Sequence, residues 1–277
     1  MKLSTAKYFS LLLIATAMVS SLSASRLYME EETERCLARC YECGCNPLYK
    51  EAWDLQVHAG VNPIIWRQRN NWVAVDQGVA VNYFESPKFS KVYRAPWYVG
   101  GQVGYAATQN GRLFIEFDYT QANRKENVVI PTLNPVFDVD NARKYKLFEA
   151  YLGGRYYFDR WADCVSFFVG AKVGLTHHKK VDFDFHFTGA GNIQVFENQF
   201  VYDSNTVVSG GAHGGFDFCV CGNWSIVVTG EVVASGGPRP AGLIATQAAG
   251  LSVTQILPAP IGSELRFPVT GALRYNF

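Results

Sequence analysis

The last fourteen residues of the chain, ELRFPVTGALRYNF, alternate between two kinds of side chain. One register is almost entirely apolar: Leu265, Phe267, Val269, Gly271, Leu273, Tyr275 and Phe277. The other is mostly polar: Glu264, Arg266, Pro268, Thr270, Ala272, Arg274 and Asn276. A period of two predicts a β-strand, because successive side chains of a strand point to opposite faces. This strand is longer than the usual strand of about five or six residues in a soluble sheet, and it suits a tilted strand that crosses a bilayer.

Seven further segments alternate in the same way. In residues 112–122, for example, Leu113 and Ile115 alternate with Arg112 and Glu116. With the terminal segment, these stretches predict eight strands, at residues 54–62, 94–107, 112–122, 144–158, 164–175, 207–220, 224–235 and 264–277.

The connections between these strands alternate between short and long. Three short turns carry the sequences TQNGRL, FDRWADC and CVCGNW, and Asn110–Gly111 in the first is a strong hairpin signal. The long connections cover residues 63–93, 123–142, 176–206 and 236–263. Short turns and both termini on one side, with long loops on the other, are typical of outer-membrane barrels. We therefore predict an all-β, eight-stranded antiparallel up-and-down transmembrane β-barrel over residues 54–277, or a ten-stranded one if segments such as Trp72–Val81 join it.

A soluble antiparallel barrel or sandwich would also alternate, but its strands rarely run this long. The composition includes 25 glycines, 14% aromatic residues and a mean hydropathy of −0.02, which fits strands with one wet and one dry face. The formal net charge of +1 gives no bulk field that would attract nucleic acid. We expect no nucleic-acid partner.

The N-terminus has the pattern of a cleavable secretory signal. Lys2 and Lys7 precede an apolar run from Tyr8 to Val19, and small residues follow it. Cleavage is expected between Ser23 and Ser25. We assign residues 1–24 to a signal peptide, 25–53 to a cysteine-rich periplasmic segment, and the remainder to the barrel.

The terminal strand, with Leu273, Tyr275 and Phe277 at alternate positions, resembles the C-terminal signal that outer-membrane barrels present to their insertion machinery. By topology, residues 54–277 resemble small eight-stranded barrels of the OmpA and OmpX type. Segments such as YLGGRYYFDRWADCVSFFVGAKVGLTHH and GGFDFCVCGNWSIVVTGEVVASGG are more loosely similar to major outer-membrane proteins of Legionella and chlamydia-like bacteria. These resemblances imply a bacterial outer-membrane location, with outer-membrane lipid and the barrel-insertion machinery as partners. Trp97, Trp161 and Trp224 are expected to anchor the barrel at the membrane interfaces.

The polar registers would collect charges of both signs in the lumen of the barrel. An eight-stranded barrel is only wide enough for side chains to fill, so these groups are expected to pair with one another. The predicted lumen charge network is Glu116, Asp118, Glu149, Asp217, Glu231, Arg112, Arg155, Lys172, Arg266 and Arg274. His58 and His213 are expected to take hydrogen-bonding roles on the same inner face. An ion-selective pore or proton path is the alternative reading of these charges.

Seven cysteines fall on the predicted periplasmic side: Cys36, Cys40, Cys43, Cys45, Cys164, Cys219 and Cys221. The periplasm is oxidising, so disulfides are the expectation, and the odd number leaves at least one thiol free or paired to another protein. The alternative for the cluster CLARCYECGC is a zinc site. A disulfide scaffold local to this short segment is expected in preference to zinc. A further hypothesis is cross-linking to other cysteine-rich envelope proteins, which resembles the chlamydial type of envelope.

The sequence favours a structural or surface-interaction role in the cell envelope. The alternatives are a small porin and a barrel-type lipid A hydrolase. A hydrolase would need His177 or His178, with Asp182, Asp184, Ser204 or Ser209, in a catalytic grouping, and nothing in the pattern fixes that geometry. We therefore expect no enzymatic activity and no cofactor. The segments VDFDFHF and NIQVFENQFVYD further predict a hairpin that projects beyond the membrane.

Overall fold

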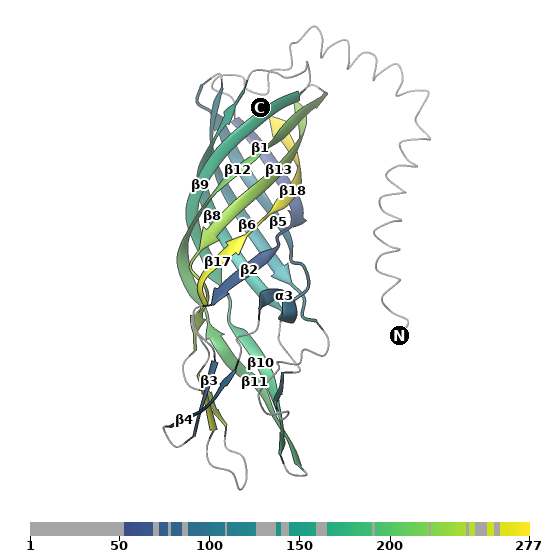
Figure 1. Cartoon of the computed structure of the whole chain (residues 1–277). Coiled ribbons are helices and arrows are strands. Elements are labelled where there is room, and N and C mark those ends of the chain that lie inside the picture. Colours follow the sequence, from purple (N-terminus) through teal and green to yellow (C-terminus); the bar gives the residue numbers. More distant parts are fainter. Residues whose placement is uncertain are drawn as a thin grey trace, which may run out of the picture.

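The protein is described from a computed structural model, in which one antiparallel barrel carries long loops at one end (Figure 1). The structure describes residues 53–68, 72–76, 79–84, 88–108, 110–125, 137–139, 144–158, 165–189, 192–221, 223–241, 244–246, 254–257 and 261–277. The predicted signal peptide and the predicted cysteine-rich segment lie outside these residues, except for Trp53 at the end of that segment, which is the first described residue. No helix in the described part is long and apolar enough to cross a membrane.

Eight strands close into a ring. They are β1 (Trp53–Val61), β5 (Trp97–Ala106), β6 (Gly111–Ala122), β8 (Tyr145–Tyr157), β9 (Val165–His178), β12 (Asn205–Cys221), β13 (Trp224–Ser235) and β18 (Val269–Asn276). Each pairs antiparallel with its sequence neighbour in this list, and β18 pairs with β1 to close the ring. The prediction of an eight-stranded antiparallel barrel is confirmed.

The predicted strand 264–277 is two strands, so the prediction of a single strand is wrong. β17 (Ile261–Arg266) ends before Phe267–Pro268, and β18 begins at Val269. The proline nitrogen cannot donate to a ladder, but the neighbouring backbone groups are bonded: Phe267 N–H donates to Pro63 O at 3.0 Å and Glu231 N–H donates to Pro268 O at 2.9 Å. Burial still alternates across the break, so the pattern that predicted the strand is retained.

A matching break at Asn62–Pro63 separates β1 from β2 (Ile64–Gln68). β2 pairs with β17, and β17 pairs with the end of β13. These two extra strands lie outside the closed ring and extend its wall toward the loops (Figure 1).

The long connections contain further short elements at the loop end of the barrel. One small sheet has the order β14 (Arg239–Pro240), β11 (Asn192–Asp203), β10 (Val181–Gly189) and β7 (Phe137–Val139). A second has the order β15 (Ile244–Thr246), β16 (Thr254–Leu257), β3 (Trp72–Asp76) and β4 (Val79–Phe84). The β10–β11 hairpin is the projecting ribbon that the sequence predicts. Because β3 and β4 belong to a separate sheet, the ten-stranded alternative is wrong.

Several other predicted boundaries move by a few residues. β5 starts at Trp97 rather than at residue 94, directly after Pro96. β9 and β12 are longer than predicted because they continue to His178 and Asn205, where they lead toward the ribbon. α3 (Phe89–Val92) is a single helical turn in the first long connection and was not predicted.

The ring places apolar side chains outside and polar side chains inside. Along β6, Leu113, Ile115 and Phe117 are 55%, 51% and 64% exposed, whereas Arg112 and Glu116 between them are buried. A soluble barrel would show the opposite arrangement. In a bilayer, this arrangement puts the apolar wall in contact with hydrocarbon and satisfies every ladder hydrogen bond within the ring.

Candidate functional site

The lumen is the most highly charged part of the molecule, and its side chains form layers along the barrel axis. At the turn end, the Arg274 guanidinium of β18 forms an ion pair with Asp217 at 2.5 Å and donates to the Tyr157 hydroxyl at 2.8 Å. Arg112 pairs with Asp54 beside them. These groups all come from the polar register of their strands, so the period of two alone places them inside.

Arg155 of β8 occupies the next layer. It donates to Gln56 at 3.1 Å, to Gln102 at 2.9 Å and to His213 at 3.3 Å. Its guanidinium carbon also lies 5.0 Å from the ring centre of Phe114 and 4.8 Å from that of Phe168. Two neutral amides, a histidine and two aromatic faces thus surround this cation, and they fill the width of the lumen.

Lys172 of β9 lies at the centre of the third layer. Its ammonium group is 2.5 Å from Glu116 of β6 and 2.6 Å from Glu231 of β13, and it lies over the Tyr151 ring. All three charged side chains are nearly inaccessible to solvent. Because the two carboxylates come from opposite sides of β9, Lys172 links three parts of the wall through the lumen.

Three metal-ligating side chains lie beside Lys172. Ligand atoms of His58, Glu116 and Asp118 lie within 4.8 Å of one another, and His58 Nε2 is 2.6 Å from Asp118 Oδ1. Lys172 already supplies a cation to Glu116. The cluster is therefore explained as part of the lumen charge network without a metal ion.

The fourth layer joins β17 to β8. Arg266 pairs with Glu149 and donates to Thr176 at 3.0 Å, while the Tyr151 hydroxyl donates to the same Glu149 carboxylate. Arg266 projects from one of the two strands outside the ring, so this contact ties the wall extension to the barrel.

An aromatic cap closes the lumen at the loop end. It consists of Trp66 of β2, Phe89 of α3, Tyr93, Tyr145 of β8 and Tyr202 of β11. Trp66 makes edge-to-face contacts with Phe89 and Tyr145, with ring centres 5.0 Å and 5.6 Å apart. Burial, with Tyr202 and Asp182 nearby, holds the pKa of the Tyr93 phenol well above its ordinary value. We call this group the aromatic cap.

Glu264 of β17 binds the aromatic cap from the lumen side. It accepts hydrogen bonds from Trp66 Nε1 at 3.0 Å and from the Tyr145 hydroxyl at 2.6 Å. The Tyr145 hydroxyl also lies 2.9 Å from His178 Nδ1. The indole of Trp66 and the hydroxyl of Tyr145 therefore both meet polar atoms, as buried groups of this kind require. The buried Tyr93 hydroxyl has no hydrogen-bond partner among the described residues.

The structure places all ten charges of the predicted lumen network inside the barrel, each at most 7% exposed. His58 and His213 also lie there. Sequence reasoning left Asp54 and Glu264 out of the network although both stand in polar registers, and their spacing could have identified them. The aromatic cap carries no comparable signal, because Trp66, Phe89 and Tyr93 belong to a connection without strand periodicity.

The remaining predicted residues are distributed differently. Cys36, Cys40, Cys43, Cys45, Cys164 and Trp161 lie outside the described residues, Cys219 is half-buried near the turn end, and Cys221 ends β12. In the proposed insertion signal, Leu273 is exposed on the outer wall, and the rings of Tyr275 and Phe277 lie 5.2 Å apart. Trp97 and Trp224 are exposed near opposite ends of the wall.

The histidines considered for catalysis face opposite sides of the wall. His177 bonds to the Thr206 hydroxyl at 2.9 Å on the outside, whereas His178 bonds to Tyr145 inside. Ser209 and Asp182 are buried and Ser204 is exposed. The hydrogen bonds described for the two histidines are therefore to residues other than Ser204 and Ser209.

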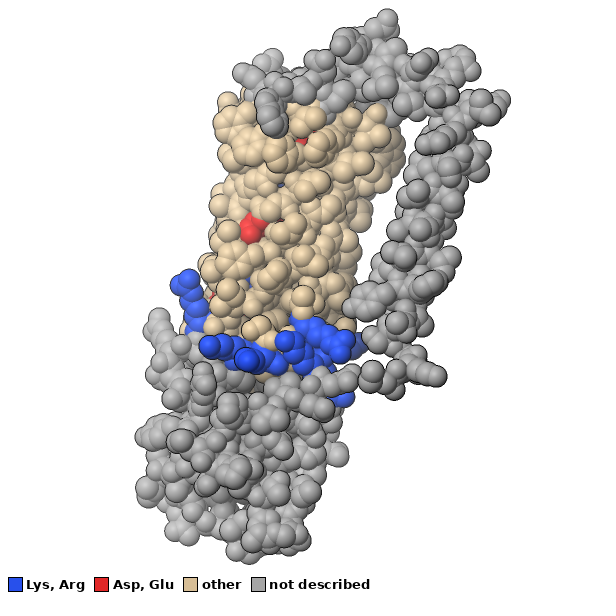
Figure 2. All heavy atoms as spheres, turned by 45° about the vertical axis from the view of Figure 1, so that its right-hand side comes forward, with Lys and Arg blue, Asp and Glu red and all other residues tan. Residues whose placement is uncertain are grey.

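A belt of basic residues surrounds the barrel where the wall meets the loops, and Figure 2 shows it on one face. Among side chains that the structure describes, every exposed charged side chain is basic and lies at this end. We call these residues, together with the half-buried Lys146, the basic belt: Arg67, Lys88, Lys91, Arg94, Arg124, Lys125, Lys144, Lys146, Lys179, Lys180 and Arg239.

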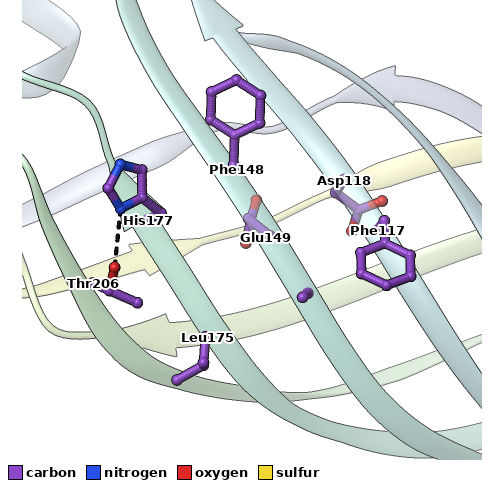
Figure 3. Close-up of a pocket in the computed structure, with 8 residues that line it drawn as sticks. Phe117, Asp118, Phe148, Glu149, Leu175, His177 and Thr206 are labelled. Carbon is purple, nitrogen blue, oxygen red and sulfur yellow. Dashed lines mark hydrogen bonds between the residues drawn. The ribbon is translucent and has the colours of Figure 1, made fainter.

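Next to the belt, on the side of the short turns, the outer wall has a hollow of about 300 Å³ across β6, β8, β9 and the start of β12. It is bordered by Phe117, Asp118, Phe148, Glu149, Ala150, Leu175, His177 and Thr206 (Figure 3). Ala150 pairs with Phe117 on one side and with Leu175 on the other. The Ala150 side chain is a single methyl group, whereas Phe117, Phe148 and Leu175 around it are larger. This difference in side-chain size accounts for the hollow.

The closed ring, the apolar outer wall and the charged lumen define the class of the protein: it is an integral β-barrel of the bacterial outer membrane. No protein-family model matches the chain, and neither does any curated protein.

The chain is similar to solved structures of small outer-membrane barrels. Neisserial surface protein A is 13% identical with a TM-score of 0.41, covering 81% of this chain and 97% of that one. Outer membrane protein AlkL is 13% identical with a TM-score of 0.41, covering 83% and 92%. The attachment invasion locus protein Ail of Yersinia pestis is 11% identical with a TM-score of 0.35, covering 83% and 100%. These values are too low to transfer any ligand or activity, and the class assignment rests on the ring and its burial pattern.

Proposed function

We propose that this barrel has a structural and surface-interaction role in the cell envelope and does not conduct solutes. The observation that carries the proposal is the filled lumen. Four successive layers of paired or hydrogen-bonded side chains, centred on Arg274, Arg155, Lys172 and Arg266, span its width. A small porin would need a continuous water path past these layers.

The aromatic cap supports the same proposal. Trp66, Phe89, Tyr93 and Tyr145 are all at most 7% exposed, so they leave little room for water to enter from the loop end. The cap is joined to the barrel by Glu264, whose two hydrogen bonds hold the Trp66 and Tyr145 rings in place.

The projecting sheets are the proposed interaction surface. By the usual orientation of outer-membrane barrels, short turns face the periplasm and long loops face outward. The β10–β11 hairpin and the β3–β4 hairpin would then extend outside the cell (Figure 1). A strand edge in such a ribbon offers unpaired backbone groups that another chain can bind.

On the periplasmic side, we propose that cysteines link the barrel to other cysteine-rich envelope proteins. Cys219 and Cys221 lie at the turn end of β12, and the remaining cysteines are outside the described residues. Gel mobility of envelope extracts with and without reductant tests this link. Higher-mass species that reductant converts to the monomer are expected, and a monomer under both conditions would contradict it.

Single-channel conductance in planar bilayers tests the closed lumen. Purified folded protein is expected to give no reproducible open step, whereas an established porin reconstituted in parallel gives one. A reproducible step from the purified barrel would favour the alternative, a small porin. The proposal also includes the absence of enzymatic activity, and release of acyl chains from lipopolysaccharide by the purified protein would contradict that part.

A further inference from the structure

The outer wall carries an apolar hollow and a group of cations side by side, and together they have the properties of a lipid-binding site. The hollow lies between Phe117, Phe148 and Leu175 (Figure 3), and the small side chain of Ala150 also lines it. Phe117, Phe148 and Leu175 are 64%, 45% and 52% exposed on the hydrocarbon-facing wall. A volume of about 300 Å³ is at the lower end of ordinary ligand sites.

Three lysines lie immediately beyond this hollow, at the loop-side ends of β8 and β9. Lys146 lies two residues before Phe148 on the same face of β8, and Lys144 lies two residues before Lys146. Lys179 follows the end of β9, its backbone N–H donates to Lys146 O at 3.1 Å, and its ammonium group lies 5.4 Å from the centre of the Phe148 ring. Phe148 therefore belongs to both the hollow and the cationic group.

The charges around the site favour an anion. Within the part of the chain that the structure describes, Lys144, Lys146 and Lys179 form no ion pair with a carboxylate. Asp118 and Glu149 border the hollow, but their carboxylates are engaged in the lumen by His58 and Arg266. An anionic head group beside the lysines would therefore meet positive charge, while both described carboxylates at the hollow are already engaged.

We infer that this face binds lipid A, the phosphorylated, multiply acylated lipid of lipopolysaccharide. An acyl chain would occupy the hollow at Ala150, and phosphate groups on the disaccharide would contact Lys146 and Lys179, with Lys144 in reach. The clustering of three lysines at the ends of two neighbouring strands, β8 and β9, favours a head group with more than one phosphate over a phospholipid with one. With the loops outward, the site faces the outer leaflet, where lipopolysaccharide is found. This inference does not depend on whether the lumen conducts.

Native mass spectrometry of the detergent-solubilised, folded full-length protein, titrated with lipid A, tests the site. Two variants address its two parts: Ala150→Leu fills the hollow, and Lys146→Gln with Lys179→Gln removes the cations. Matched controls are Ala171→Leu, on the outer wall of β9 away from the hollow, and Lys88→Gln with Lys91→Gln, in the basic belt at α3. Heat-modifiable gel mobility shows that each variant is folded.

The wild type and both controls are expected to retain lipid A equally. The double lysine variant is expected to bind it about 25-fold more weakly, since each lysine near a lipid surface contributes on the order of a fivefold change in affinity. Ala150→Leu is expected to bind it about tenfold more weakly, which is roughly the effect of two acyl methylene groups that lose their apolar contact. Equal retention by wild type and folded site variants would overturn the site. Equal retention of dephosphorylated lipid A would overturn the role of the lysines. Retention of phosphatidylglycerol equal to that of lipid A would overturn the assignment of the ligand.

Discussion

Lys172 of β9 lies 2.5 Å from the carboxylate of Glu116 of β6, across a strand that separates the two in the wall. The same ammonium group reaches Glu231 of β13 at 2.6 Å. Contacts of this kind join non-adjacent strands through the interior, so the barrel is held together by its lumen as well as by its ladders.

Lys172→Met is expected to destabilise the barrel by about 3–5 kcal/mol, because it leaves two buried carboxylates without their cation. The midpoint of urea unfolding, followed by heat-modifiable gel mobility, measures this loss. Lys91→Met, at an exposed position of α3, should stay within about 0.5 kcal/mol of wild type. Adding Glu116→Gln and Glu231→Gln to Lys172→Met should recover part of the loss, and no recovery would contradict the electrostatic explanation.

Tyr145→Phe tests the anchor of the aromatic cap. It keeps the ring but removes the hydroxyl that contacts Glu264 and His178. The expected loss is about 1–3 kcal/mol, because a buried carboxylate loses one of its donors. Tyr119→Phe is the control, since among the described residues its hydroxyl bonds only to Gln121, on the outer surface. If both variants unfold at the same urea concentration as wild type, Glu264 does not hold the cap.

Two glycines in strands differ in the space around them: Gly100 lies in a packed position and Gly271 in an open one. A Cβ atom at Gly100 would collide with the side chains of Asp118 and His58, whereas one at Gly271 would meet no described atom within 4 Å. Gly100→Ala is expected to cost about 1–3 kcal/mol through overpacking. Gly271→Ala is expected to be neutral or to stabilise by up to about 1 kcal/mol. Unfolding midpoints in the reverse order would show that the lumen is looser than described.

Phe277→Ala tests the terminal insertion signal. Fewer folded barrels are expected in the outer membrane, because the resemblance assigns Phe277, with Tyr275 and Leu273, to recognition by the insertion machinery. Heat-modifiable protein in membrane fractions provides the measurement. Tyr156→Ala removes an exposed aromatic side chain from the outer face of β8 and serves as the control. An equal reduction in both variants would show a general loss of wall aromatics and not a specific signal.

The barrel could be predicted from the sequence because one physical rule, the alternation of side chains along a strand, governs it throughout. Arg112 and Glu116 are inside and Leu113 and Ile115 are outside for the same reason. The interruption at Phe267–Pro268 was missed because burial continues in register across it. The proline itself could have indicated the interruption, because its nitrogen cannot donate a hydrogen bond to a neighbouring strand.

The aromatic cap and the hollow could not be predicted in the same way. Trp66, Phe89 and Tyr145 come from three separate elements, and only the closed fold brings them together. The hollow at Ala150 depends on the register between β6, β8 and β9, which places Phe117 and Leu175 beside it. Strand patterning gives the face of each residue but not its partner on the next strand.

Carbene labelling from within the bilayer tests most directly which side chains face hydrocarbon. A photoactivatable apolar probe dissolved in the membrane would be activated around the folded protein, and labelled residues would be mapped by mass spectrometry. Labels are expected on Leu113, Ile115 and Phe117, and none on the inward aromatic residues Phe114 and Phe168. Labelling of Phe114 and Phe168 with the three outer residues unlabelled would contradict the account.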